Sequence, residues 1–103
     1  MAKLKVEWTS NAKIELSQIL DYIDEKWTER ELKRFAFLLE KNISIIVSFP
    51  YIFPASSQNS SVRRCVISKQ TSLYYKIEED RIVILSLFDN RQNPNKLIKH
   101  IIK

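Results

Sequence analysis

The sequence predicts an α+β domain in the order β-α-α-β-β-β-(α), with an antiparallel sheet backed by an antiparallel helical hairpin and a short C-terminal helix. Two observations lead to this fold class. Apolar residues recur every three or four positions through residues 12–49, which is the period of amphipathic helices. Residues 62–87 instead hold three runs rich in β-branched and aromatic residues, separated by short polar turns. Helices and strands are therefore segregated along the chain.

Residues 3–8 form the first predicted strand, because polar and apolar side chains alternate there. Leu4, Val6 and Trp8 share one face, which we expect to point toward the core. A helix of about four turns follows, and any of residues 9–11 can cap its start. Its apolar stripe, which we predict to be buried, consists of Ala12, Leu16, Ile19, Ile23 and Trp27.

A second helix begins at a capping box in which Thr28 is the cap and Glu31 the third helical residue. The helical period continues to Phe49, where Pro50 ends it, and Phe35 is predicted to lie in the core. Because the junction between the helices is so short, they must form an antiparallel hairpin.

The three later strands are predicted at residues 62–67, 72–77 and 81–87, after a polar loop at 51–61. The run 72–77 alternates, so we expect it to show the core one face only. The run 82–87 is almost continuously apolar, which is typical of a central strand covered on both faces. Pro94 fits the first turn of a closing helix. The apolar stripe of that helix is Leu97, Ile98, Ile101 and Ile102, which either folds back onto the domain or contacts a partner.

Composition limits the function. The chain has 103 residues, enough for a single domain (1–103), and its 17 Lys+Arg against 12 Asp+Glu give a net charge of +5, which favours an acidic partner. It contains no glycine, so a glycine-rich phosphate loop is impossible and we expect no cofactor. A lone histidine, His100, and a lone cysteine, Cys65, give no support for a metal site or an internal disulfide. Neither a signal peptide nor a membrane-spanning run is expected, which predicts a cytoplasmic protein.

The candidate functional residues are cationic or polar and lie in or beside the predicted sheet. Arg63 and Arg64 are adjacent in a strand, so their side chains must point to opposite faces. Each of them, like Arg91 after the last strand, is either a binding residue or a surface residue engaged in structural contacts. Further candidates for contacting a target are Lys69 in a turn, Tyr74 on the polar side of its strand, and Asn90.

The order of these segments resembles the RelE/ParE superfamily, the toxins of bacterial type II toxin–antitoxin pairs. The resemblance spans roughly residues 4–97 and rests on several stretches together. These are Val6-Glu7-Trp8-Thr9, Ile19-Leu20-Asp21-Tyr22-Ile23, Phe49-Pro50, Val62-Arg63-Arg64, Tyr74-Tyr75-Lys76-Ile77, and the run from Ile82 to Pro94. The resemblance implies either a ParE-like inhibitor of DNA gyrase or a RelE-like endoribonuclease that cuts messenger RNA on the ribosome, so whether the protein is an enzyme stays open here.

Compared with the RelE-like pattern, the cationic set is present in part. Arg63, Arg64 and Arg91 would grip the scissile phosphate, but Ser72 stands where a strand arginine is usual. Leu97 stands near the position of a terminal tyrosine, and the only histidine, His100, comes later still, so the expected proton carrier is missing or displaced. The ParE-like branch is therefore favoured. In either branch the resemblance implies a small acidic antitoxin, encoded by an adjacent gene, that covers the stripe of Leu97, Ile98 and Ile101.

Overall fold

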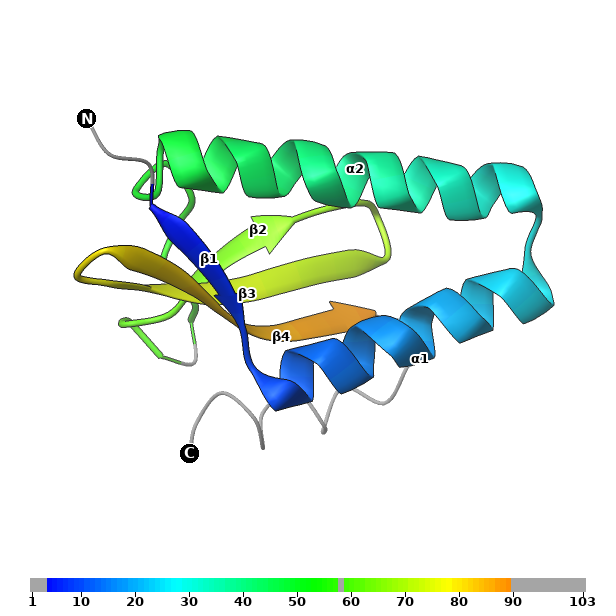
Figure 1. Cartoon of the computed structure of the whole chain (residues 1–103), viewed down its shortest axis with the longest axis horizontal. Coiled ribbons are helices and arrows are strands. Elements are labelled where there is room, and N and C mark those ends of the chain that lie inside the picture. The colour runs from blue at the N-terminus through cyan, green and yellow to red at the C-terminus, as the bar shows by residue number, and fades with distance from the viewer. Residues whose placement is uncertain (1–3, 58, 90–103) are drawn as a thin grey trace.

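The computed structural model describes residues 4–57 and 59–89. The elements are β1 (Lys5–Trp8), α1 (Ser10–Lys26), α2 (Glu29–Ser48), β2 (Arg63–Val66), β3 (Thr71–Glu78) and β4 (Arg81–Asp89). Figure 1 shows the two helices running away from a shared tip, with the strands packed beside the open end of the hairpin. The predicted α+β class and the order of these elements are confirmed. The predicted C-terminal helix lies outside the described residues.

The four strands form one sheet in the order β1-β4-β3-β2. β3 is antiparallel to both of its neighbours, but β1 runs parallel to β4, with Val6 opposite Ile82. The sheet is therefore mixed, where the order of elements had suggested antiparallel pairing throughout. The reason lies in the connection: parallel neighbours need a long crossover, and here both helices and two strands intervene between β1 and β4.

Two threonines cap the helices and fix where each begins. The Thr9 hydroxyl oxygen accepts from the Ala12 amide at 3.1 Å, and the same hydroxyl donates to the Leu85 carbonyl at 3.2 Å. The Thr28 hydroxyl oxygen accepts from the Glu31 amide at 3.2 Å, as the capping box predicts. Thr9 thus both starts α1 and ties that start to β4.

The main core lies between the hairpin and one face of the sheet. α1 contributes Ile19 and Ile23, and α2 contributes Phe35, all buried as predicted. Leu4, Val6 and Trp8 pack against this core with partial burial, also as predicted. The remaining buried members are Ala12, Leu39, Ile46, Cys65, Ile67, Leu73, Tyr75, Ile82, Ile84 and Leu87.

Trp27 was predicted to be buried, and that prediction is wrong. It is the C-terminal cap of α1 and remains 47% exposed. Figure 1 shows that the tip of the hairpin extends past the sheet. Trp27 caps α1 at that tip, so the apolar helical period continues beyond the part of the hairpin that lies beside the sheet.

The prediction that β3 shows the core one face only is also wrong. Tyr74, on the face away from the main core, is only 4% exposed and packs with Val62, Leu85 and Phe88 in a second, smaller cluster. A β-bulge helps to form this cluster: Tyr74 pairs with Ser86 and Tyr75 with Ile84, so that Leu85 is the extra residue. The side of β3 that alternation marks as polar is therefore covered at Tyr74.

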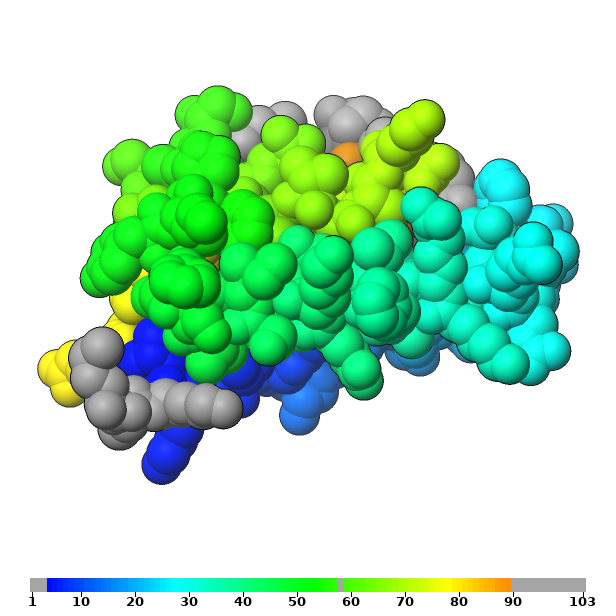
Figure 2. All heavy atoms as spheres, turned by 90° about the horizontal axis from the view of Figure 1, so that it is seen from above, coloured from blue at the N-terminus to red at the C-terminus, as the bar shows by residue number. Residues whose placement is uncertain are grey.

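The predicted loop after α2 is fastened to the sheet. The Tyr75 hydroxyl donates to the Pro50 carbonyl at 2.7 Å, and the Arg64 amide donates to the Pro54 carbonyl at 3.0 Å. An isolated bridge pairs Ala55 with Arg63. Figure 2 shows this segment, in green, gathered at the C-terminal end of α2. It therefore follows the outer edge of β2 and forms one wall of the site described next.

Candidate functional site

A cavity of about 410 Å³ opens beside β2 and β3, on the face of β3 away from the main core; we call it the open-face pocket. β2 and β3 supply its floor and the fastened loop supplies one wall. No Asp or Glu is among the described residues that line it. They include Pro54, Ala55, Ser56, Ser57, Arg64, Val66, Lys69, Ser72, Tyr74 and Phe88.

Arg64 is the best-placed cation of the pocket. Its side chain is exposed, and its Nε donates to the Ser72 hydroxyl oxygen at 3.2 Å. In the antiparallel register Arg64 lies directly opposite Tyr74. Among the described residues the guanidinium has no carboxylate within ion-pair distance. The sheet therefore orients Arg64 through neutral groups and leaves its charge uncompensated there.

Tyr74 lies in the floor of the pocket, opposite Arg64 in the strand register. Burial raises the pKa of its hydroxyl, while the charge of Arg64 and a hydrogen bond with it act in the opposite direction. The hydroxyl therefore stays protonated at neutral pH. It is a hydrogen-bonding group beside Arg64 and not a ready proton acceptor.

Arg63 points to the opposite side of β2, as the strand period predicts. Its Nη1 donates to the Phe53 carbonyl at 2.7 Å, and its guanidinium carbon lies 5.0 Å from the centre of the Tyr51 ring. These contacts hold the loop after α2. The structure thus separates two arginines that the sequence could not rank: Arg64 lines the pocket, and Arg63 braces the pocket wall.

The other predicted site residues have different outcomes. Lys69 lines the open-face pocket from the β2–β3 turn, and Tyr74 lies in its floor. Asn90 and Arg91 lie outside the described residues, as do the predicted antitoxin contacts Leu97, Ile98 and Ile101. Their roles stay predictions.

Several lining residues were not selected from the sequence. Ser72 was noted only as the place of an absent arginine, yet it is the side chain that positions Arg64. Its parity with Tyr74 along the strand was the available signal, because both residues must share one face. The contribution of Pro54, Ala55 and Ser56 had no such signal, since it depends on how the loop folds back along β2.

Cys65 offers no nucleophile. It is fully buried, its thiol donates to the Asn42 side-chain oxygen at 3.5 Å, and burial raises its pKa to about 11. Within residues 4–57 and 59–89, no group of three His, Cys, Asp or Glu side chains could hold a metal ion. No described helix combines the length and apolarity that crossing a membrane requires.

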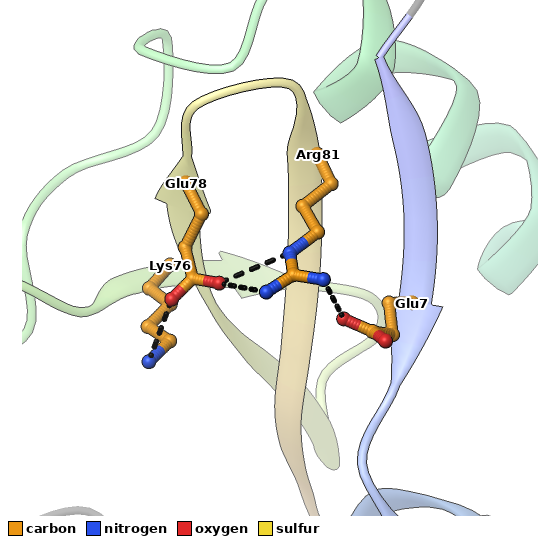
Figure 3. Close-up of polar contacts among 4 residues, drawn as sticks. All are labelled: Glu7, Lys76, Glu78 and Arg81. Carbon is orange, nitrogen blue, oxygen red and sulfur yellow. Dashed lines mark hydrogen bonds and ion pairs between the residues drawn. The ribbon is translucent and has the colours of Figure 1, made fainter.

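A different arrangement of charges occupies the other end of the sheet, at the β3–β4 turn. Figure 3 shows Arg81 between two carboxylates. Its Nη2 lies 2.7 Å from Glu78 Oε1, and its Nη1 lies 3.0 Å from Glu7 Oε2. Lys76 completes the cluster, with its Nζ 3.2 Å from Glu78 Oε2. Each cation here is paired, and the cluster links β1, β3 and β4.

Comparison with solved structures identifies the architecture. The toxin–antitoxin system ParDE of P. aeruginosa contains a chain that matches with a TM-score of 0.70 at 15% identity, over 84% of this chain and 96% of that one. This chain has the RelE/ParE-like toxin fold. A YoeB/ParE toxin from Agrobacterium tumefaciens matches with a TM-score of 0.62 at 12% identity, over 84% of this chain and 98% of that one.

A third match to the RelE/ParE-like fold comes from the toxin–antitoxin complex RelBE2 of Mycobacterium tuberculosis. Its TM-score is 0.57 at 18% identity, over 85% of this chain and 99% of that one. Neither a protein-family model nor a curated protein matches the sequence. Since the identities are low, the likeness lies in the fold, and function must be argued from the site.

Proposed function

We propose that this chain is the toxin of a bacterial type II toxin–antitoxin pair and that it inhibits growth by binding DNA gyrase. The observation that carries the proposal is Arg64, held by a rigid sheet in a pocket of hydroxyl groups with no acidic lining residue among those described. An arginine in such surroundings binds a carboxylate or a phosphate of a partner. The shared fold of known toxins supports the class of function.

The pocket chemistry favours binding over cutting. Cleavage of RNA by a general acid and base needs side chains that exchange protons near neutral pH. The described lining residues include no histidine, aspartate or glutamate, and the pKa of the Tyr74 hydroxyl is raised. This part of the molecule therefore supports a non-enzymatic inhibitor.

A second candidate function is a RelE-type, ribosome-dependent endoribonuclease. The observation that favours it is that two cations, Arg64 and Lys69, line one cavity. Their positive charges would stabilise the negative charge that develops on a scissile phosphate. In that case Arg64 would act with Arg91, and Arg63 would contribute by holding the loop. The proton carrier would have to come from another part of the chain or from the ribosome.

Either activity implies an antitoxin partner, and the solved structures of the same fold include a toxin–antitoxin system and a toxin–antitoxin complex. We propose an acidic antitoxin, encoded by an adjacent gene, that offsets part of the +5 charge and covers Leu97, Ile98 and Ile101. Both proposed targets place the protein in the cytoplasm.

Expression of the full chain in bacteria separates the two activities. A gyrase inhibitor causes DNA breaks and induces the damage response while messages stay intact, and the purified chain inhibits DNA supercoiling in vitro. A ribonuclease instead arrests translation at once and leaves messages cut at fixed codon positions. If expression neither inhibits growth nor causes DNA breaks or cut messages, the toxin proposal is contradicted.

A further inference from the structure

The edge strand β1 leaves one side of the sheet open. Among the described strands only β4 pairs with it, and in Figure 1 β1 lies in front of the other strands with no described element drawn over it. A strand at the edge of a sheet presents backbone N–H and C=O groups that can pair with another chain. The open edge of β1 is therefore a surface to which a further strand can be added.

The β1–β4 register fixes which backbone groups of β1 face this edge. The Lys5 amide donates to the Asp80 carbonyl and the Thr9 amide donates to the Ile84 carbonyl, each at 3.1 Å, so the odd-numbered residues face β4. Because backbone groups alternate along a strand, the N–H and C=O of Val6 point outward. Two antiparallel copies of β1 with Val6 opposite Val6 would therefore exchange both hydrogen bonds of that pair.

The side chains of β1 are complementary to those of a second, antiparallel copy. In that register Lys5 of each copy lies opposite Glu7 of the other, and Leu4 lies opposite Trp8. Lys5 and Glu7 are exposed, and they form the non-hydrogen-bonded pairs, in which opposed side chains approach most closely. Lysine on an edge strand hinders pairing with an unrelated strand, but a second copy of this chain supplies the carboxylate that neutralises it.

An apolar groove of about 350 Å³ adjoins the Trp8 end of this edge, between β1 and α1. Its lining consists of Trp8, Lys13, Leu16, Ser17 and Leu20. The three apolar members are only partly buried by the fold. Leu4 of a second copy, opposite Trp8, would lie against this groove and add apolar contact to the backbone pairing.

We propose that this chain forms a two-fold symmetric homodimer, in which β1 pairs antiparallel with β1 of a second copy and the two sheets become continuous. Such an interface needs a surface that is complementary to itself, and residues 4–8 are complementary in both charge and apolar character. The strand has four residues, so the dimer is weak and depends on concentration. The open-face pocket lies beside β2 and β3, away from the β1 edge, so this inference does not depend on what that pocket binds.

Analytical ultracentrifugation of the full chain over a concentration series measures the dimer. We expect the mass to rise from that of one chain toward twice that value. Lys5→Glu places like charges opposite each other at two symmetric positions and should weaken the dimer by about tenfold or more. Lys26→Glu makes the same charge change at an exposed position in the last turn of α1, at the tip of the hairpin. It is the matched control and should leave the dissociation constant nearly unchanged.

A mixing experiment tests the register. Glu7→Lys should be monomeric by itself, as Lys5→Glu should be, because each variant places like charges opposite each other. An equimolar mixture of the two variants should form a heterodimer, since every cross-strand pair then joins a glutamate to a lysine. A chain that carries both changes should associate with itself as the unmodified chain does. The Tm of each variant is measured first, because Glu7→Lys also removes the contact with Arg81.

Three results overturn the proposal. One is a chain that stays monomeric at about 1 mM, which would leave the β1 edge to a strand of another protein or to water. Another is that Lys5→Glu and Lys26→Glu weaken the dimer equally, which would mean that only net charge matters. The third is that the two folded variants do not associate when mixed. None of these results bears on gyrase inhibition or message cleavage, so the two proposals fail separately.

Discussion

The two ends of the sheet treat the same residue type in opposite ways. At the β3–β4 turn, Arg81 lies between Glu7 and Glu78 (Figure 3). At the other end, Arg64 donates to the hydroxyl of Ser72 and has no carboxylate near it among the described residues. Both arginines are exposed strand residues with a second residue of the sheet to hold them. What differs is the charge of that neighbour.

This difference separates structural arginines from binding arginines. Two cations and two carboxylates meet around Arg81, so the cluster has little net charge to offer a ligand. The Ser72 hydroxyl orients Arg64 but does not neutralise its charge. A binding arginine is therefore distinguished from a structural one by the charge of the side chain that holds it, and not by being an arginine.

The largest expected effect is that of Arg64→Ala. A charge-assisted hydrogen bond contributes about 1.5–3 kcal/mol, so target affinity should fall by roughly ten- to a hundredfold and growth inhibition should be lost. The free energy of unfolding should change by less than about 0.5 kcal/mol, because the side chain is exposed. Growth assays and denaturant titration measure the two quantities. Arg30→Ala, at an exposed position of α2, is the control, and equal toxicity of both variants would remove Arg64 from the site.

Arg64 can be given the kind of neighbour that Arg81 has. Ser72→Asp places a carboxylate where the hydroxyl now accepts from Arg64 Nε. We expect a loss of target affinity that approaches that of Arg64→Ala although the arginine remains, because the ion pair competes with the target. Ser72→Asn, which is similar in size but neutral, should lose only severalfold. If the Asp and Asn variants behave alike, shape rather than charge governs the pocket.

A smaller effect is expected when the compensated end is broken. Arg81→Ala removes the contacts to Glu7 and Glu78, which link β1 to the β3–β4 turn. Because the pairs are exposed, Tm should fall slightly, and the difference from the unmodified chain should shrink as salt is added. Growth inhibition should be unchanged. Loss of toxicity at normal stability would show that this end of the sheet also contacts the target.

The smallest effect is the pH dependence of the same cluster. Hydrogen bonds from Arg81 and Lys76 hold the pKa of Glu78 below its ordinary value of 4.5. A carboxyl whose pKa is lowered by folding stabilises the folded state above its unfolded pKa, and that stabilisation is lost as the pH falls through the folded pKa. Tm should therefore decrease modestly on acidification below about pH 4.5. Glu78→Gln should lack this component, and an identical Tm profile for both proteins would contradict the assignment.

Patterns local in sequence allowed most of the fold to be predicted. The helical period, the Thr28 capping box and the apolar run of β4 all act over a few residues, and the elements form where these patterns place them. Predictions failed where a distant part of the chain decides burial. Glu15 is a charged residue of α1, and nothing near it in the sequence indicates that its carboxylate accepts from the Ser86 hydroxyl at 2.8 Å and from the Leu87 amide at 3.3 Å.

The candidate site could be predicted only in part for the same reason. That Arg63 and Arg64 take opposite faces follows from the strand period alone. Which of them faces the pocket depends on the loop after α2, since Phe53 and Tyr51 engage Arg63. No local pattern in the sequence encodes that contact.

The sequence by itself determined the helices, the strands, their order, and the alternation of side chains along each strand, because these depend on neighbours in the chain. Only the tertiary structure decided that β1 pairs in parallel with β4, that Tyr74 is buried while Trp27 remains half exposed, and that Arg64 rather than Arg63 lines the open-face pocket. Those outcomes depend on contacts between segments that are far apart in the sequence. Such contacts decide which side chains are buried and which charges are compensated.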